Sequence, residues 1–332
     1  MINWGIIGCG DVTEIKSGPA FNKVKDSHLV AVMRRNATLA EDYAKRHNVP
    51  RFYSNADDLI NDKEVNAIYV ATPPASHAGY AIASIRAGKP VYIEKPMAVN
   101  YAECVKINTE AKKYNVPVFV AYYRRTLPGY LKVKDLVENG SIGNVRFVQI
   151  QLFKAPSEQE IAGKLPWRVD PEVSGGGHFF DLASHQLDYL DYLFGPIENT
   201  RSIVCNHAGL YKAEDFVTST FSFPRNIAGI GTWSFSVSPE SERDSIEIIG
   251  DKGSIRFSTY NFEPILLIDS SGRQEFINER PEHVQYNLIE KVVQSLNGNG
   301  SSPSTGLTGA RTNKVMDEIV ENYYSKRDKN NR

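Results

Sequence analysis

The sequence has little of what marks secreted, metal-binding or membrane proteins. Its three cysteines, Cys9, Cys104 and Cys205, are too few and too widely spaced for a disulfide framework or a zinc site. No apolar run approaches the roughly 18 residues of a membrane span, and the N-terminus lacks the basic region of a signal peptide. The formal net charge is -1, so no overall field attracts nucleic acid or an anionic membrane. We therefore expect a cytoplasmic protein with no metal, nucleic-acid partner or membrane partner.

What the chain does have is an ordinary globular composition and enough length for two domains. Hydrophobic residues make up 41% and charged residues 23% of the sequence, as in average folded proteins. A chain of 332 residues is longer than a single core usually supports. We expect one domain over residues 1–122 and a second over residues 123–332.

A glycine-rich turn follows the first predicted strand. Residues 2–8 read I-N-W-G-I-I-G, and Gly8 and Gly10 supply the first two glycines of the dinucleotide pattern G-x-G-x-x-G. The first glycine makes a tight turn, and the second lets the backbone approach a pyrophosphate at a helix N-terminus. Thr13 stands at the third position, where glycine or alanine is usual, so helix and strand are expected to pack slightly less closely. The pattern predicts cofactor contacts by Gly8, Cys9, Gly10, Asp11 and Val12.

The residues after the second predicted strand indicate which cofactor is bound. In NAD-binding proteins an acidic residue about 20 positions after the fingerprint accepts the ribose 2′-hydroxyl. Here Arg34 and Arg35 occupy that place, and no Asp or Glu occurs between Ser27 and Ala40. One guanidinium can bind a 2′-phosphate bidentately, and a second can stack on the adenine. We therefore predict NADP as the preferred cofactor and NAD as the second choice; the alternative is a solvated basic turn.

Short apolar strands and helices alternate to about residue 121 and predict a doubly wound parallel sheet. The strand over residues 67–71 ends in T-P-P-A-S-H, and the strand over 90–93 ends in E-K-P. Because ligands bind at the carboxyl edge of such sheets, Lys95 is expected to donate to substrate oxygens, the alternative being a solvated charge. His77 is expected to contact the nicotinamide end of the cofactor, the alternative being a cap on the following helix. The predicted cofactor contacts in these loops are Thr72, Pro73, Pro74, His77, Glu94 and Lys95.

The stretch Ser174–Asp188, S-G-G-G-H-F-F-D-L-A-S-H-Q-L-D, carries the strongest candidates for chemistry. On an α-helix, Asp181, His185 and Asp188 project from one face. A carboxylate one turn from an imidazole orients the ring and stabilises its charged form, as a proton-shuttling histidine requires. The alternative is an ordinary surface pair. His178 either faces the substrate or has a capping or surface role.

The second half of the chain predicts a different kind of sheet. Strands separated by turn residues are expected over 145–153, 200–205, 216–223, 227–235, 245–249, 254–258 and 265–268. Successive strands with short connections favour an antiparallel sheet. Helices are expected over 128–138, 282–296 and 306–324, followed by a charged tail that frays. An open sheet face with aromatic side chains needs a cover, which favours a homodimer or a dimer of dimers.

The motifs, in this order, resemble the glucose–fructose oxidoreductase and inositol dehydrogenase family (Gfo/Idh/MocA). The resemblance rests on the initial G-x-G, on A-T-P-P-x-x-H, on E-K-P and on G-G-G-x-x-x-D-x-x-x-H. It implies an α/β protein with an N-terminal Rossmann domain and a C-terminal α+β domain that has a large open, mostly antiparallel sheet. It also implies that Lys95, Asp181 and His185 are the catalytic residues.

From the motifs and the resemblance we expect an NADP(H)-dependent oxidoreductase acting on a secondary alcohol or carbonyl of a sugar, polyol, inositol or diol. His185 would serve as general acid and base, Lys95 as donor to the reacting oxygen and Asp181 as orienting carboxylate. Arg124, Trp167 and Arg168 are expected near the nicotinamide ribose or the substrate, the alternative being an inter-domain packing cluster. The other function classes are a lyase, epimerase or glycoside-cleaving enzyme that recycles a retained cofactor, and a cofactor-sensing regulator.

Overall fold

The computed structural model describes residues 1–330 and divides into two compact units. The first unit comprises Met1–Thr126 and Pro281–Ala310, and the second comprises Leu127–Arg280 and the described chain from Arg311 onward. The sequence predicted a single boundary after residue 122. In the structure the first unit runs to Thr126 and also takes in a segment from near the end of the chain.

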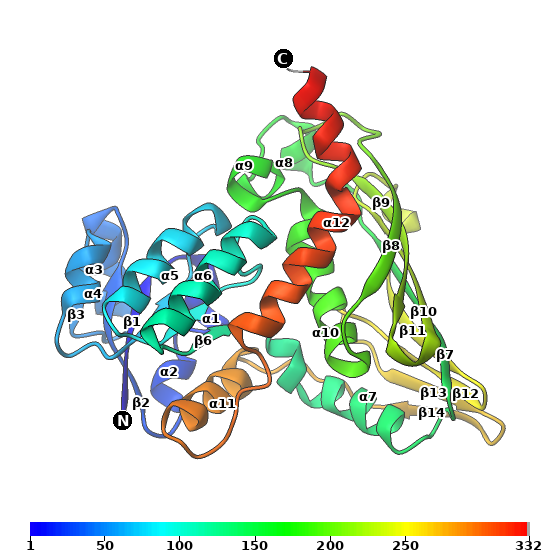
Figure 1. Cartoon of the computed structure of the whole chain (residues 1–332), viewed down its shortest axis with the longest axis horizontal. Coiled ribbons are helices and arrows are strands. Elements are labelled where there is room, and N and C mark those ends of the chain that lie inside the picture. The colour runs from blue at the N-terminus through cyan, green and yellow to red at the C-terminus, as the bar shows by residue number, and fades with distance from the viewer. Residues whose placement is uncertain (331–332) are drawn as a thin grey trace. The chain divides into compact units, whose positions relative to one another are not determined.

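A parallel six-stranded sheet in the order β3-β2-β1-β4-β5-β6 forms the first unit (Figure 1), which confirms the predicted Rossmann fold. Its strands are β1 (Ile2–Ile7), β2 (Ser27–Met33), β3 (Arg51–Tyr53), β4 (Ala67–Val70), β5 (Val91–Ile93) and β6 (Val118–Val120). The strand order reverses between β1 and β4, and ligands bind doubly wound sheets at such a switch point. The Gly8 turn follows β1 and the Thr72 loop follows β4, so both lie at that point.

Helices cover both faces of this sheet. On one face α4 (Ala56–Asn61), α5 (His77–Arg86) and α6 (Tyr101–Tyr114) contribute Leu59, Ile85 and Ile107 to one buried core. On the other face α2 (Ala20–Lys23), α3 (Ala37–Arg46) and α11 (Tyr286–Leu296) contribute Phe21, Tyr43 and Val292. Because α11 buries its apolar face in the Rossmann core, residues 281–310 belong to the first unit.

The second unit contains an eight-stranded sheet in the order β14-β13-β12-β11-β7-β10-β9-β8. Only the β7–β10 pair is parallel among the paired strands described, so the predicted mostly antiparallel sheet is confirmed. The strands are β7 (Val145–Phe153), β8 (Glu198–Cys205), β9 (Phe216–Phe223), β10 (Ile227–Ser234), β11 (Arg243–Gly250), β12 (Gly253–Phe257), β13 (Ile265–Asp269) and β14 (Gly272–Phe276). The sequence missed β14, an edge strand whose residues G-R-Q-E-F are mostly polar and exposed.

One face of this sheet is covered by α7 (Pro128–Glu138), α10 (Ser184–Phe194) and the part of α12 (Gly306–Asn330) that belongs to this unit (Figure 1). In α10, Gln186 accepts a hydrogen bond from Trp233 Nε1 at 2.7 Å and donates to Thr259 Oγ1 at 2.8 Å, so the buried amide is satisfied. The last helix continues past its predicted end at Tyr324. Asn331 and Arg332, at the end of the tail expected to fray, lie outside the described residues.

Candidate functional site

The glycine turn after β1 has the geometry that the dinucleotide pattern predicts. Gly8 has a φ of 95°, and a Cβ there would lie 2.6 Å from Thr72 Cγ2, so no side chain fits. At Gly10, which caps α1 (Asp11–Ile15), the nearest atom to an added Cβ is 4.0 Å away. The turn therefore packs tightly against the β4 loop at Gly8 and leaves open space at Gly10, where a phosphate would approach the backbone.

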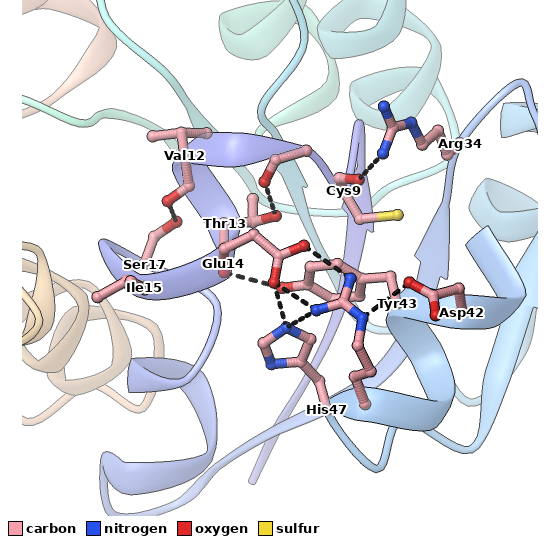
Figure 2. Close-up of polar contacts among 12 residues, drawn as sticks. Cys9, Val12, Thr13, Glu14, Ile15, Ser17, Arg34, Asp42, Tyr43 and His47 are labelled. Carbon is pink, nitrogen blue, oxygen red and sulfur yellow. Dashed lines mark hydrogen bonds and ion pairs between the residues drawn. The ribbon is translucent and has the colours of Figure 1, made fainter. Parts of the chain in front are cut away.

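Thr13 fits its position better than the sequence led us to expect. The residue is fully buried, and its hydroxyl donates to Gly10 O at 2.8 Å. Its carbonyl accepts a bond of 2.8 Å from the hydroxyl of Tyr43, in α3 (Figure 2). Burial raises the pKa of Tyr43 to about 12, so the hydroxyl keeps its proton for this bond. The threonine side chain thus adds one hydrogen bond between α1 and the turn, and its backbone carbonyl links α1 to α3.

An ion cluster that the sequence did not predict also fastens α1 to α3 (Figure 2). Arg46 donates to the two oxygens of Glu14 at 2.7 and 2.8 Å, and His47 Nε2 lies 2.8 Å from the same carboxylate. Arg46 also reaches Asp42, at 2.7 Å. The hydrogen bond from Arg46 is the main reason that the pKa of Glu14 falls to about 2. Glu14 lies 32 positions before Arg46 along the chain, which is why no local pattern indicated the cluster.

The two arginines predicted to bind the 2′-phosphate and to stack on the adenine follow β2. Arg34 is half-buried and its Nη1 lies 3.5 Å from the carbonyl oxygen of Cys9, inside the glycine turn (Figure 2). Arg35 is exposed. Within the described part of the chain neither guanidinium forms an ion pair with a carboxylate. Burial raises the pKa of the Cys9 thiol to about 11, against the opposing effect of Arg34. A cationic site without a protein counter-ion therefore lies beside the turn.

His77 joins the two loops at the carboxyl edge of the sheet. Its ring is completely buried, with Nε2 2.6 Å from Thr72 O and Nδ1 3.1 Å from Pro96 O. Burial lowers the pKa of His77, despite the two carbonyl oxygens. Both ring nitrogens face backbone oxygens, so the contacts favour a role in positioning the loops over the predicted contact with the cofactor.

Glu94, between β5 and Lys95, is also turned into the protein. Its carboxylate accepts hydrogen bonds from the hydroxyl of Tyr69, from Gln285 Nε2 at 2.5 Å and from the amide of Lys95 at 3.1 Å. Gln285 in turn accepts a bond of 2.9 Å from the hydroxyl of Tyr92. These contacts favour a positioning role over the predicted cofactor contact. Lys95 itself lies half-buried at the carboxyl end of the sheet, as predicted.

The segment with the predicted catalytic pair is not the regular α-helix that the spacing predicted. Residues Phe179–Ala183 form a π-helical turn, η4, and α10 begins only at Ser184. Asp181 lies inside the π turn and His185 in the first turn of α10. His185 is buried, and its ring packs edge-on to Tyr260 at 6.4 Å between centroids. Short π-helical insertions are frequent at functional sites.

Of the predicted residues Trp167 and Arg168, Arg168 forms an ion pair with Asp181 within the second unit. Both belong to a short helical turn, η3 (Trp167–Val169). Arg168 Nε lies 3.2 Å from Asp181 Oδ2, and its guanidinium packs over the Trp167 ring at 4.6 Å. Arg124, in contrast, belongs to η2 (Tyr123–Thr126) in the first unit, where it is buried and donates to Tyr123 at 3.1 Å.

His178, on the same segment, pairs with a carboxylate that the sequence did not predict, that of Glu160. His178 Nε2 is 2.6 Å from Glu160 Oε1. Glu160 belongs to α8 (Glu158–Ile161), which begins with a capping box between Ser157 and Glu160. The S-x-x-E spacing at residues 157–160 was the available signal for this helix. Asp188, first grouped with the catalytic pair, is buried and accepts a bond of 3.2 Å from Thr312.

Comparisons with known proteins identify the fold family. The GFO/IDH/MocA model described as an oxidoreductase family with an NAD-binding Rossmann fold matches residues 2–122, and the GFO/IDH/MocA C-terminal domain model matches residues 130–256. An oxidoreductase, P35, from Formosa agariphila is 42% identical over 318 residues, covering 95% of this chain and 97% of the relative. The chain belongs to the GFO/IDH/MocA family. It is therefore an NAD(P)-dependent oxidoreductase with the two-part fold of that family.

Other proteins resemble this chain at lower identity, in sequence or in fold. A trans-1,2-dihydrobenzene-1,2-diol dehydrogenase from Bos taurus is 24% identical over 276 residues, covering 83% of this chain and 79% of the relative. A levoglucosan dehydrogenase solved with NADH superposes with a TM-score of 0.88 at 21% identity, covering 96% of each chain. An aldose–aldose oxidoreductase from Caulobacter crescentus gives a TM-score of 0.85 at 21% identity, again covering 96% of each chain.

No helix among residues 1–330 is long and apolar enough to cross a membrane. In the same part of the chain, no group of His, Cys, Asp and Glu side chains is arranged to hold a metal ion.

Proposed function

We propose that this oxidoreductase prefers NADP(H) and interconverts a secondary alcohol and a carbonyl on a sugar, polyol, inositol or diol. The observation that carries the proposal is the segment of the second unit on which an oriented carboxylate precedes a buried histidine. Arg168 holds Asp181 at 3.2 Å, and His185 follows in the first turn of α10. An acid–base group with a fixed carboxylate nearby suits proton exchange with a substrate hydroxyl.

In this proposal the protein moves the proton that accompanies hydride transfer. When bound, the nicotinamide accepts or supplies the hydride at its C4 atom. In the oxidising direction His185 takes the hydroxyl proton, and in the reducing direction it returns a proton to the carbonyl oxygen. Lys95 donates a hydrogen bond to the same oxygen and stabilises the negative charge that develops there. Asp181, fixed by Arg168, orients the imidazole.

The preference for NADP rests on the two arginines after β2. Neither has a carboxylate partner among the described side chains, and Arg34 lies against the glycine turn. A doubly charged 2′-phosphate would neutralise this site, whereas the 2′-hydroxyl of NAD would leave it unpaired. The levoglucosan dehydrogenase structure contains NADH, so the preference is proposed for this chain and not for the whole family. The further cofactor or substrate contacts proposed are residues 8–12, Thr72, Pro73, Pro74, Arg124 and Trp167.

The substrate class follows from what the relatives are named for. Three of the proteins described above are named for their substrates: a dihydrobenzene diol, levoglucosan and aldoses. Each name denotes a molecule with hydroxyl groups on adjacent or nearby carbons. We therefore propose a neutral polyhydroxylated substrate for this chain as well.

We also propose that the enzyme forms a homodimer, or a dimer of dimers, through the uncovered face of the eight-stranded sheet. Alternate residues of its strands point away from α7 and α10, and four large apolar ones are exposed there: Phe147, Ile203, Ile230 and Ile268. Apolar side chains gathered on one open face favour association. We infer that the enzyme works in the cytoplasm, where free thiols such as Cys9, Cys104 and Cys205 stay reduced.

A substrate panel tests the proposed function. Sugars, polyols, inositols and diols are incubated with NADP and, in parallel, with NAD, and reduced cofactor is followed by absorbance. We expect turnover of at least one panel member, with a higher kcat/KM for NADP. Product formation from a panel member with tightly retained cofactor and no net reduction would instead show a lyase, epimerase or glycoside-cleaving enzyme. Cofactor binding without conversion of any panel member would show a sensor.

A further inference from the structure

The loop between β7 and η4 is tied to the π-helical segment at two points. Glu160 binds His178 at 2.6 Å, and Arg168 binds Asp181 at 3.2 Å. His178 is the residue directly before the π-helical turn, and Asp181 lies within that turn. The loop therefore supplies partners to two side chains of the segment that carries the proposed acid–base group.

The His178 ring is fixed in orientation. Besides the bond to Glu160, it packs edge-on to Tyr211 at 5.8 Å and tilted against Phe235 at 5.3 Å between ring centroids. Glu160 is 5% exposed and is itself held by Ser157, whose amide and hydroxyl donate to Oε2 at 2.8 and 2.7 Å. A surface histidine needs no such support. The arrangement resembles the way a proton-carrying or ligand-binding imidazole is oriented by a carboxylate.

The charge state of Glu160 sets the tautomer of the ring. Burial alone would raise the pKa of Glu160, but hydrogen bonds from Ser157 and His178 outweigh it and lower the pKa. An ionised carboxylate only accepts, so Nε2 of His178 carries the proton toward Glu160. In the singly protonated form of the ring, which the inference below requires, Nδ1 is then an acceptor. It has no hydrogen-bond partner among the described residues, and it is not one of their solvent-inaccessible polar atoms.

We propose that His178, held by Glu160, is a specificity-determining residue that accepts a hydrogen bond from one substrate hydroxyl through Nδ1. The inference rests on the proposed function and adds a particular contact to it. The site selects a neutral hydroxyl over a carboxylate, because an acceptor nitrogen backed by a negative charge repels an anionic group. The exposed ring of Trp167, beside Arg168 in the same loop, is a suitable surface for the carbon face of such a molecule.

The test distinguishes the contribution of Nδ1 of His178 from that of Nε2. His178→Asn places an amide near the position of Nδ1 and loses the bond to Glu160. His178→Gln reaches Glu160 but has no acceptor at the Nδ1 position. The best panel substrate and its monodeoxy analogues are then compared by kcat/KM with wild type, both variants and His207→Gln, an exposed histidine of the same unit that serves as control. Thermal unfolding verifies that each variant is folded.

We expect His178→Gln to lower kcat/KM for the full substrate by about 10- to 100-fold. For one monodeoxy analogue the loss disappears, because the hydroxyl that His178 binds is already missing. His178→Asn retains most of the wild-type selectivity, and His207→Gln leaves it unchanged. Equal losses for all analogues, or no loss for any, overturn the inference, since a structural role does not depend on one hydroxyl.

Failure of the proposed function gives a different result. If wild type turns over no panel member, calorimetric titration of the NADP-saturated proteins with the same panel replaces the rate measurement. A polyol that binds wild type but not His178→Gln supports the contact while refuting the proposed oxidation of panel substrates. Equal binding by the two proteins, or no binding of any panel member to wild type, overturns the contact.

Discussion

Replacing Glu94 by alanine tests whether this carboxylate holds the Lys95 edge of the sheet or contacts the cofactor. In the structure three donors converge on it: the Tyr69 hydroxyl, Gln285 Nε2 and the Lys95 amide. After the substitution Tyr69 can still donate to Ser17, 3.1 Å away. Gln285 and the Lys95 amide are left without this acceptor inside the protein. The positioning role therefore predicts a loss of stability even when no cofactor is present.

The size of the loss follows from those two donors. Each buried donor without an acceptor costs about 1–3 kcal/mol, and relief of the buried carboxylate offsets part of the total. We expect Glu94→Ala to lower the free energy of unfolding by about 2–4 kcal/mol. For a unit of this size that corresponds to a decrease in Tm of roughly 5–15 °C. Glu94→Gln keeps one oxygen acceptor and should lose about half as much.

The assay is thermal and urea unfolding of the cofactor-free protein, combined with titration of NADPH. Glu41→Ala serves as control, because Glu41 forms an exposed ion pair with Lys45 at 2.7 Å and such pairs contribute about 0–1 kcal/mol. The positioning role is refuted if Glu94→Ala unfolds like the control while its affinity for NADPH falls at least about tenfold. That outcome would support the contact between Glu94 and the cofactor that the sequence predicted.

Three further substitutions test other parts of the proposal. Arg34→Asp should weaken NADP relative to NAD by about 10- to 100-fold, because it replaces a phosphate donor by a like charge; an unchanged ratio of Kd values in titrations contradicts the 2′-phosphate role. His185→Ala should lower kcat by about 10²- to 10⁴-fold with cofactor affinity unchanged; near-normal turnover of the best panel substrate would remove His185 from the mechanism. Glu14→Gln removes a carboxylate whose folded pKa is about 2, against 4.5 for the free group. Wild type should therefore be the more stable protein above pH 4.5, and its advantage should shrink as the pH falls toward 2, as unfolding midpoints across that range would show; a pH-independent difference argues against the ion cluster.

The Rossmann half could be predicted because its signals are local. The Gly8 turn directly follows an apolar strand and directly precedes a helix, and Arg34 directly follows the next strand. Chain order then places the ends of these strands at one edge of the sheet. The contacts that hold the predicted residues in place could not be predicted from the sequence. Gln285 reaches Glu94 across 191 positions of the sequence, and no periodicity or motif encodes a pairing at that distance.

The helices between β7 and α10 show a second limit. No helix was predicted over residues 154–163, yet Ser157 and Glu160 form a complete capping box at the start of α8. The helix is a single turn, too short for a hydrophobic period to appear in the sequence. It is stabilised instead by its cap and by the bond from Glu160 to His178. The bond from Glu160 that helps to stabilise this short helix also makes His178 a candidate for substrate recognition.

The π-helical turn around Asp181 is where the segment departs from the regular α-helix that the spacing predicted. A widened turn shifts the backbone bonds and leaves carbonyl oxygens open to side-chain donors. Two such bonds are present: Ser184 Oγ donates to Asp181 O at 3.2 Å, and the Tyr260 hydroxyl donates to Leu182 O at 2.6 Å. Tyr260 also packs against the His185 ring. The residue that stabilises the irregular turn thus also borders the proposed proton-exchanging imidazole, so the departure from the α-helix and the placement of His185 have a common physical basis.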